Sequence, residues 1–285
     1  MSLLGDLREL TKPRITRMNV LMALGGYALA GGSFKPVTVG AAMAGTALAV
    51  MSANTLNQYL ERDIDGRMAR TANRPLVRDR MTAKTALWFG IAMGVLSTAI
   101  LLAAVNTVTA ALGLFALLSY VLVYTPLKQT TPLSLVVGAV PGAVPPLMGW
   151  TAATGVIDGP GLALFAILLV WQLPHFLAIS MYRFDDYARA GFKTVPVVRG
   201  DRVAKAQAVA WSIALVPISL SLLPLGVASW IYGGTAAVLG VWFLAWALKG
   251  LRPDAGVKWA RGFFLFSIVY LPALVVALAV DVTVL

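Results

Sequence analysis

Residues 54–75 read NTLNQYLERDIDGRMARTANRP and turn an apolar run into the most charged segment of the chain. Asn57, Glu61 and Asp65 are spaced four residues apart, so on a helix their side chains form one stripe. Asp63 lies near the edge of that stripe. The basic residues that follow directly are Arg67, Arg70 and Arg74. The segment therefore combines a helical stripe of oxygen ligands with a group of guanidinium side chains.

Two interpretations of this segment stay open at this point. Magnesium accepts carboxylate and amide oxygens while it keeps several waters, and guanidinium groups form paired hydrogen bonds with phosphate oxygens. The segment would then hold a magnesium-bound phosphate or diphosphate. Alternatively, it is a charged cytoplasmic loop whose arginines only fix the orientation of the chain in a membrane.

The composition indicates an all-α, polytopic membrane protein. Of 285 residues, 59% are hydrophobic and 12% are charged, and the absence of cysteine excludes disulfides and thiolate chemistry. Apolar runs of spanning length predict nine helices in one membrane-embedded domain, residues 1–285. The predicted spans are residues 17–34, 37–58, 84–104, 107–125, 133–153, 161–181, 207–226, 229–248 and 263–281.

The charged residues predict the orientation. With the N-terminus inside, 22 of the 23 basic residues fall in cytoplasmic segments, and only Lys35 lies on the other side. Because basic residues accumulate in cytoplasmic loops, we expect a multi-pass protein of the cell (plasma) membrane, the inner membrane of a bacterium. Its N-terminus would be cytoplasmic and its C-terminus outside.

Ten of the 12 acidic residues lie on that same cytoplasmic side, which the orientation rule does not require. They concentrate in two loops, one around Glu61 to Asp65 and one at Asp185 and Asp186. Four predicted spans separate the two loops, so both face the same side. This spacing suggests a repeat of four plus four helices with a ninth added. We expect the two acidic loops to converge on one ligand.

Two glycine patterns indicate how the helices pack. Gly90 and Gly94 are four residues apart, a spacing that lets helix backbones approach closely. The fifth predicted span contains a doubled GAVP sequence from Gly138 to Pro146, and its prolines leave carbonyl groups without helical partners. That span is either a kinked packing helix or one whose kink widens a cavity, and we favour the cavity.

The sixth predicted span carries polar groups within the apolar region, at Trp171, Gln172 and His175. A lone histidine is commonly structural, but an ionisable group inside a membrane is by default functional. The loop that follows adds Asp185 and Asp186, which would hold a second magnesium unless the loop is merely solvated. Its basic residues, which would bind further phosphate oxygens, are Arg183, Arg189 and Lys193.

Together these segments resemble the UbiA-type intramembrane prenyltransferases, and within them the branch whose acceptor is heme. The resemblance rests on the stripe of residues 57–65 with MARTANRP at 68–75, and on WQLPHF at 171–176. It rests also on YTPLK at 124–128, the doubled GAVP at 138–146 and DDY at 185–187. The match runs from residue 13 to about 200, with the motifs in the family's order; the last three spans are similar only in being apolar.

The resemblance implies transfer of the farnesyl group of farnesyl diphosphate to the 2-vinyl group of heme B, giving heme O and diphosphate. It implies Mg²⁺ as cofactor, heme as substrate, a helix bundle round a central cavity and an active site on the cytoplasmic side. Membrane lipid would surround the prenyl tail. A heme A synthase or a terminal oxidase assembly would use the product.

The family also implies residue roles. The catalytic set is Asn57, Glu61, Asp65, Asp185 and Asp186, with metal ligands among Asn57, Glu61, Asp65, Asp63 and Asp186. Diphosphate would be bound by Arg67, Arg70, Arg74 and Lys193. Heme and the prenyl chain would contact Trp171, Gln172, His175, Phe176, Tyr124 and Tyr182.

This sequence departs from the family pattern at two places. The family usually has aspartate where Glu61 stands, and a longer glutamate reaches further toward a metal. The second motif of the wider superfamily is a spaced DxxxD, but Arg183 and Tyr187 occupy those positions here. A second magnesium is therefore less firmly implied than the first.

Two other functions compete with heme farnesylation. A related enzyme would prenylate an aromatic or quinone-ring acceptor, but the WQLPHF and DDY segments favour heme. A membrane transporter would place its ionisable groups near the middle of the membrane. Here the acidic residues gather at one membrane edge, which favours the enzyme.

Overall fold

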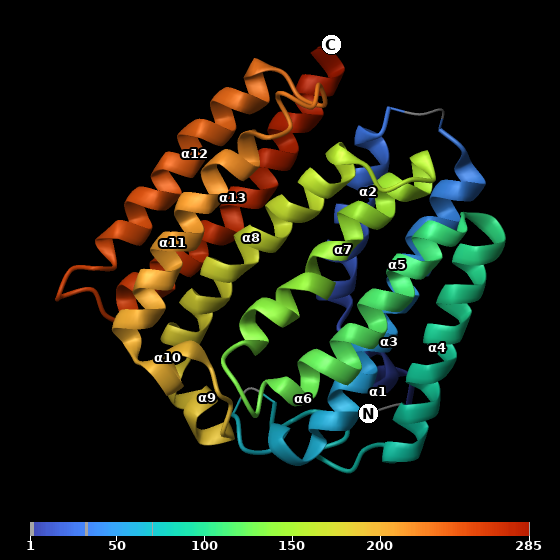
Figure 1. Ribbon diagram of the computed structural model, residues 1–285. Coiled ribbons are helices and arrows are strands. Elements are labelled where there is room, and N and C mark those ends of the chain that lie inside the picture. The colour runs from blue at the N-terminus through green and yellow to red at the C-terminus, as the bar shows by residue number, and fades with distance from the viewer. Residues whose placement is uncertain (1–2, 32–33, 70, 285) are drawn as a thin grey trace. The chain divides into compact units, whose positions relative to one another are not determined.

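The structure is a computed structural model that describes residues 3–31, 34–69 and 71–284, leaving aside the side chains of residues 282–284. Within those residues it contains helices and no strands, as the apolar runs predicted (Figure 1). The helices are α1 (Leu3–Leu10), α2 (Pro13–Leu29), α3 (Pro36–Asp65), α4 (Ala83–Ala104), α5 (Thr107–Leu118), the π-helical η1 (Ser119–Tyr124), α6 (Thr125–Leu127), α7 (Ser134–Thr154), α8 (Gly159–Tyr182), α9 (Phe184–Ala190), α10 (Val195–Arg199), α11 (Asp201–Leu220), α12 (Trp230–Lys249) and α13 (Val257–Val284).

Eight helical stretches in the described residues are long and apolar enough to cross a membrane. They correspond to the second through ninth predicted spans, with α5, η1 and α6 forming one continuous stretch, Thr107–Leu127. The first predicted span is occupied by α2, which has 17 residues and is shorter than the other eight. The all-α membrane fold is confirmed, while the count of nine spans stays a prediction.

Several predicted bounds were wrong for identifiable reasons. The helix at the first predicted span, 17–34, is α2 at 13–29, because Pro13 is suited to a first helical turn and Gly31 has a φ of +64°. The seventh, predicted as 207–226, is 201–220; the expected break at Pro224 and Gly226 is present but begins at residue 221. The ninth span, predicted to begin at residue 263, begins at Val257, because the first turns of its helix continue through charged residues.

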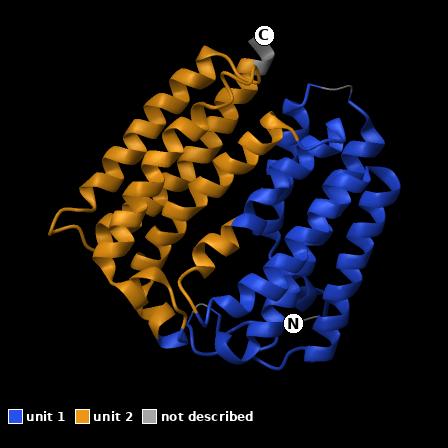
Figure 2. Ribbon diagram, in the orientation of Figure 1, with its two compact units in different colours: residues 1–130, 140–157, 189–191 blue, residues 131–139, 158–188, 192–285 orange. Residues whose placement is uncertain are grey.

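The chain divides into two compact units (Figure 2). Unit 1 comprises residues 1–130, 140–157 and 189–191, and unit 2 comprises residues 131–139, 158–188 and 192–285. Helix α7 runs from one unit into the other. The first acidic motif lies in unit 1, and the stretch WQLPHF of α8 lies in unit 2.

Unit 1 is held by close helix contacts that glycines make possible. Ser52 of α3 donates to the carbonyl of Gly90, and Ser97 of α4 donates to the carbonyl of Gly45, both at 2.7 Å. A Cβ on Gly90 would lie 2.7 Å from the side chain of Leu56, so the predicted close approach is confirmed. These contacts fix α4 against α3, the helix that carries the acidic stripe.

Helix α7 stays helical from Ser134 to Thr154 although Pro141, Pro145 and Pro146 lie inside it. The Gln172 amide donates to the carbonyl of Ala139 at 3.3 Å, so one carbonyl of this proline-rich helix has a partner from α8 within unit 2. The cavity that we expected from the doubled GAVP sequence stays a prediction.

In unit 2, α8 packs against α11 and α13, and α12 packs against α11 and α13. Asp281 of α13 caps the start of α12, because its carboxylate accepts hydrogen bonds from the Ser229 backbone N–H and hydroxyl. Ser229 is the N-cap residue of α12, and the first N–H groups of a helix have no partners within it. A buried carboxylate there satisfies them and complements the positive end of the helix dipole.

We expect Asp281→Ala to lower the free energy of unfolding by about 2 kcal/mol, since it removes a helix cap and leaves buried donors unpaired. Thermal unfolding in detergent checks this expectation. Asp254→Ala is the matched control, because that carboxylate is exposed in the same unit. Equal melting temperatures for the two variants would show that the cap contributes nothing.

Candidate active site

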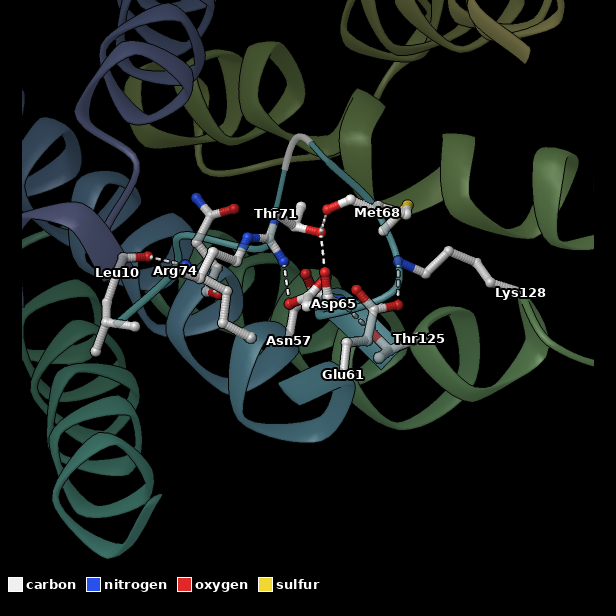
Figure 3. Close-up of polar contacts among 11 residues, drawn as sticks. Leu10, Asn57, Glu61, Asp65, Met68, Thr71, Arg74, Thr125 and Lys128 are labelled. Atoms are coloured by element: carbon white, nitrogen blue, oxygen red, sulfur yellow. Dashed lines mark hydrogen bonds and ion pairs between the residues drawn. The ribbon is translucent and has the colours of Figure 1, made fainter. Parts of the chain in front are cut away.

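The acidic stripe of α3 is buried. Asn57, Glu61 and Asp65 have exposed fractions of only 2%, 3% and 1%, and Figure 3 shows their side chains on one side of the helix. The helix continues without a break to Asp65, so the predicted spacing does place the three residues in one stripe. Buried carboxylates are costly unless they are paired, so Glu61 and Asp65 each require a partner.

Both carboxylates have cationic partners. Arg74 forms an ion pair and hydrogen bond with Asp65, and Lys128 forms an ion pair with Glu61 (Figure 3). Arg74 comes from the loop after α3, whereas Lys128 directly follows α6. The predicted diphosphate ligand Arg74 is thus part of the cluster. The sequence analysis did not assign a role to Lys128. Its position at the end of the YTPLK segment, 124–128, is the feature that could have indicated one.

A π-helical stretch brings the end of the α5–η1–α6 segment toward α3. The Thr125 hydroxyl donates to the carbonyl of Tyr120 at 2.8 Å, and the Asn57 amide donates to the same hydroxyl at 3.2 Å. The Asn57 amide nitrogen is therefore occupied, and its carbonyl oxygen is left as an acceptor. Short π-helical segments occur frequently at functional sites. Here the segment also places Lys128 4.9 Å above the ring of Tyr124.

The loop after α3 is fastened on both sides. The Thr71 hydroxyl donates to the carbonyl of Asp65, and Arg80 pairs with Asp6 at 2.7 Å and Glu9 at 2.8 Å. The Gln58 amide of α3 donates to the carbonyl of Leu10 at 2.8 Å. Helix α1 and the loop are thus both tied to α3, and this holds Arg74 beside Asp65.

Lys12, which precedes α2, adds a third basic group near the cluster. Burial, and after it the positive charges of Arg74 and Lys128, lower the pKa of its ammonium group from 10.5 to about 7, against the opposing effect of Glu61 and Asp65. Sequence reasoning missed Lys12, because it lies 45 residues before Asn57 in the chain. Near neutral pH this lysine changes its charge within the site.

The donor set fits magnesium. Two carboxylates and an amide oxygen are hard ligands of the kind that Mg²⁺ takes. One Asp65 oxygen pairs with Arg74, but the buried Oδ1 has no hydrogen-bond partner within the described residues. An unpaired buried carboxylate oxygen is expensive to maintain. A cation at this position would satisfy it. No group of three or more acidic or histidine side chains in the described chain is arranged as a metal site, so a magnesium ion bound by both carboxylates would take its third protein ligand from a group such as the Asn57 amide.

Asp63 and Arg67, the other described residues of the first motif with predicted roles, are both exposed. The Asp63 side chain is 81% exposed and 3.9 Å from Arg62, so the structure does not bring it to the buried stripe. Arg67 is exposed, and Arg70 lies outside the described residues. Asp63 as a metal ligand and Arg67 and Arg70 as diphosphate ligands therefore stay predictions.

The predicted heme and prenyl contacts from α8 form an aromatic face in unit 2. Trp171 stacks on His175 with ring centroids 4.8 Å apart, and Phe176 lies 5.6 Å from the His175 ring. Gln172 is buried and hydrogen-bonded as described above. The Tyr182 ring has the Arg183 guanidinium 4.7 Å from its centroid. The sixth predicted contact, Tyr124, belongs to unit 1.

The second acidic loop is less enclosed than the first motif. Asp185 and Lys193 are exposed and Asp186 is half-buried, with an Asp186 oxygen 3.7 Å from Arg183. These residues belong to unit 2 and the buried stripe belongs to unit 1. Convergence of the two acidic loops on one ligand stays a prediction.

Comparisons with known proteins agree on one family. The UbiA prenyltransferase family matches residues 19–269. A protoheme IX farnesyltransferase of Anaeromyxobacter sp. (strain Fw109-5) is 50% identical over 273 residues, which are 96% of this chain and 92% of that relative. Another, from Myxococcus xanthus (strain DK1622), is 47% identical over 277 residues, 97% of this chain and 94% of that relative.

Solved structures agree on the fold. A structure of digeranylgeranylglyceryl phosphate synthase has a TM-score of 0.86 with 15% sequence identity, covering 100% of both chains. A UbiA homologue from Archaeoglobus fulgidus bound to GPP and Mg²⁺ has a TM-score of 0.67 with 17% identity, covering 96% of this chain and 99% of that one. At such low identity these likenesses show the shared fold alone.

Proposed function

The chain belongs to the UbiA prenyltransferase family, and we propose that it transfers the farnesyl group of farnesyl diphosphate to the 2-vinyl group of heme B, giving heme O and diphosphate. Relatives named for this reaction share about half of its residues over nearly the whole chain. The observation that carries the chemistry is the buried stripe Asn57, Glu61 and Asp65, with Arg74 and Lys128 already paired to its carboxylates. Family membership also disfavours the alternative of a transporter.

The atoms of the reaction balance as follows. The bond between farnesyl C1 and the diphosphate oxygen breaks, and its electron pair leaves with diphosphate. The terminal vinyl carbon of heme supplies the electron pair of the new carbon–carbon bond. Water then adds to the other vinyl carbon and loses a proton, which gives a hydroxyethylfarnesyl group. The protein must therefore stabilise a departing anion and a short-lived allylic cation.

Magnesium, held by Asn57, Glu61 and Asp65, would supply positive charge to the leaving diphosphate. Basic side chains of the protein would also supply positive charge to the diphosphate. Arg74 and Lys128 now neutralise Asp65 and Glu61, so arrival of a metal and a diphosphate would let them turn from carboxylate to phosphate oxygens. Such exchange keeps every buried charge paired before and after binding, which a low-dielectric site requires. Lys193 and the second acidic loop are further proposed contacts.

Tyr124 would stabilise the allylic cation. The amine of Lys128 lies 4.9 Å from the centroid of the Tyr124 ring. Tyr124 and the stripe both belong to unit 1. The electron-rich face of a tyrosine ring attracts cations. Once Lys128 has moved to the diphosphate, that face is available to the farnesyl cation. Phe176 and Tyr182 are the corresponding proposals from unit 2.

The multi-pass membrane character follows from the eight apolar helices and the family. We further propose that the N-terminus is cytoplasmic, the C-terminus is outside and the site faces the cytoplasm, in the plasma membrane. The basic residues of the loops support this orientation. Delivery of heme O to a heme A synthase or a terminal oxidase assembly belongs to the same proposal.

We expect the proton uptake that accompanies diphosphate binding to depend on pH because of Lys12. Because its pKa is lowered to about 7, the amine is mostly neutral at about pH 8, and a bound diphosphate would raise the pKa and draw in a proton. We expect uptake of about one proton per diphosphate at about pH 8 and almost none at about pH 6, where Lys12 is already charged. The charged groups around it are Arg74, Lys128, Glu61 and Asp65.

Calorimetric titration with a non-hydrolysable farnesyl diphosphate analogue, in buffers of different ionisation enthalpy, measures this uptake. Lys12→Met is the matched variant, because it keeps the side-chain length without the amine. It should bind the analogue without the additional proton. Identical buffer dependence for both proteins would rule Lys12 out as the titrating group.

The proposed acceptor is tested with purified protein, farnesyl diphosphate and Mg²⁺. Heme B and 4-hydroxybenzoate are supplied in separate reactions, and the products are identified by mass spectrometry. We expect heme O and no farnesylated hydroxybenzoate. A product from 4-hydroxybenzoate, with none from heme, would replace this proposal by the aromatic-acceptor alternative.

A further inference from the structure

Helices α8 and α13 are joined by two side chains of α8 that contact one residue of α13. The Trp171 indole N–H donates to the carbonyl of Ser267 at 2.9 Å, and His175 Nδ1 lies 2.7 Å from the Ser267 hydroxyl oxygen. Trp171 and His175 are four residues apart, so they occupy the same face of α8. Their rings also stack on each other, 4.8 Å apart. The His175 ring is thus held in both position and plane.

The Ser267 hydroxyl decides which nitrogen of His175 carries the proton. A hydroxyl has one hydrogen, and Ser267 donates it to the carbonyl of Phe264, one turn earlier, at 2.6 Å. The hydroxyl oxygen can then only accept at its contact with His175. Nδ1 must therefore be the protonated nitrogen, and in a neutral imidazole this leaves Nε2 with a lone pair.

The opposite arrangement is less favourable. If Ser267 turned its hydrogen toward Nδ1, it would give up the bond to Phe264, and the imidazole proton would sit on Nε2. No described residue pairs with Nε2, so that N–H would lack a protein partner in an apolar helix pair. An unmade hydrogen bond of this kind costs about 1–3 kcal/mol. The network therefore favours the proton on Nδ1.

A bare Nε2 narrows what His175 can do for a porphyrin. Without a hydrogen, Nε2 cannot donate to a propionate carboxylate, so hydrogen bonding of that kind is excluded. It can coordinate iron, as neutral imidazole does in many heme proteins. A ligating histidine is usually oriented by a hydrogen bond at its other nitrogen, and Ser267 supplies that bond here.

The surroundings of His175 suit a porphyrin. Trp171, Phe176 and Phe264 have ring centroids 4.8, 5.6 and 5.1 Å from that of the imidazole, and flat aromatic rings pack well against a flat macrocycle. Tyr182 follows two turns later, about 10 Å along the helix. The guanidinium groups of Arg183 and Arg261 lie 4.7 and 5.8 Å from the centroid of its ring. Two guanidinium groups match the two propionates of heme.

We propose that the α8–α13 face of unit 2 binds heme through iron coordination by His175 Nε2, and that Ser267 is the positioning residue that keeps this nitrogen deprotonated. The inference rests on heme being the acceptor in the proposed function. It adds a residue that no motif indicated, and it selects iron coordination over hydrogen bonding as the role of His175.

The tautomer is measured on the protein without substrates. His175 is the only histidine, so ¹⁵N-histidine labelling gives one imidazole, and solid-state NMR in lipid bilayers at about pH 8 assigns its protonated nitrogen. We expect the proton on Nδ1 in the wild type and in Ser267→Thr, and a shift toward Nε2 in Ser267→Ala. A wild-type proton on Nε2 would overturn the proposal, whether or not any variant folds.

Iron coordination is measured by absorption spectroscopy during titration with heme B. The wild type should give a nitrogen-ligated spectrum that His175→Ala loses and added imidazole restores. Ser267→Ala should weaken heme binding by about tenfold, with farnesyl diphosphate binding unchanged. The matched control is Ser212→Ala, because Ser212 is a buried serine of unit 2 whose hydroxyl donates within α11, to the carbonyl of Ala208 at 2.7 Å. An unchanged heme spectrum in His175→Ala would also overturn the proposal.

These measurements separate this inference from the proposed function. Neither the NMR measurement nor the heme titration depends on turnover. A protein with the proton on Nδ1 and a His175-ligated heme supports the inference even if it makes no heme O, and that failure would count against the proposed reaction alone. Heme O formation by a wild type with its proton on Nε2 would support the reaction and refute the role of Ser267.

Discussion

Asp65→Ala is expected to lower kcat for heme O formation by about 10³-fold while the protein stays folded and membrane-inserted. Asp65 is almost fully buried, and one of its oxygens is paired with Arg74, whereas the other has no partner among the described residues. Removing it takes away a proposed magnesium ligand and leaves the Arg74 charge without its carboxylate. The measurement is heme O formed per minute by purified protein in saturating farnesyl diphosphate and Mg²⁺.

Asp63→Ala is the companion variant, two residues away on the same helix. Its carboxylate is exposed and directed to Arg62, so we expect less than about a tenfold loss of turnover. The pair therefore tests the geometry of the stripe rather than its charge. Near-normal turnover by Asp65→Ala would remove the metal role of the stripe, and an equal loss in both variants would show that the exposed Asp63 takes part after all.

Gly26→Ala is expected to prevent unit 1 from folding normally. Gly26 of α2 faces α7, and a Cβ on it would lie 2.0 Å from the carbonyl oxygen of Pro146. On the other side, a Cβ on Gly149 would lie 1.7 Å from the carbonyl oxygen of Ala23. The two backbones thus touch, and a backbone cannot move aside as a side chain can. We expect a loss of about 3 kcal/mol or more in the free energy of unfolding.

Gly25→Ala is the control for that prediction. It is the adjacent residue of the same helix, and a Cβ there would meet nothing within 4 Å. We expect its stability to stay within about 1 kcal/mol of the wild type, with a small gain from the better helix former. Thermal unfolding and the fraction of monodisperse protein after detergent extraction measure both variants. A Gly26→Ala protein as stable as Gly25→Ala would disprove the close contact between α2 and α7.

Much of the fold could be predicted because bilayer burial leaves a strong signal. Predicted spans 84–104 and 107–125 match α4 and the α5–η1–α6 stretch within two residues, since each is bounded by polar or capping residues such as Thr82 and Asn106. The prediction was wrong where helices continue through charged residues, as α3 does to Asp65 and α13 does at Lys258. Hydropathy reports burial in lipid, whereas helix ends follow capping and local contacts.

The π-helical stretch was not predictable from this sequence. Its place depends on a hydrogen bond from Thr125 to Tyr120 and on the contact of Thr125 with Asn57 of another helix. The second of these contacts joins helices that are far apart in the sequence, so local spacing does not report it. Helical spacing did predict the stripe itself, because residues four apart on one helix need no other element to bring them together.

The partners of the site residues were beyond sequence reasoning for the same reason. The spacing of Asn57, Glu61 and Asp65 says nothing about Lys128, which pairs with Glu61 from 67 residues further along the chain. The polar character of His175 likewise gave no sign of Ser267, 92 residues away.

If this buried stripe drives farnesyl transfer to heme, the reaction must form heme O and diphosphate in equal amounts. Purified protein is given heme B, farnesyl diphosphate and Mg²⁺, and heme O and diphosphate are both quantified, with Asp65→Ala in parallel. We expect one diphosphate to be released for each heme O formed, and neither product to exceed background with Asp65→Ala. Diphosphate released by the wild type with no heme O formed would contradict it.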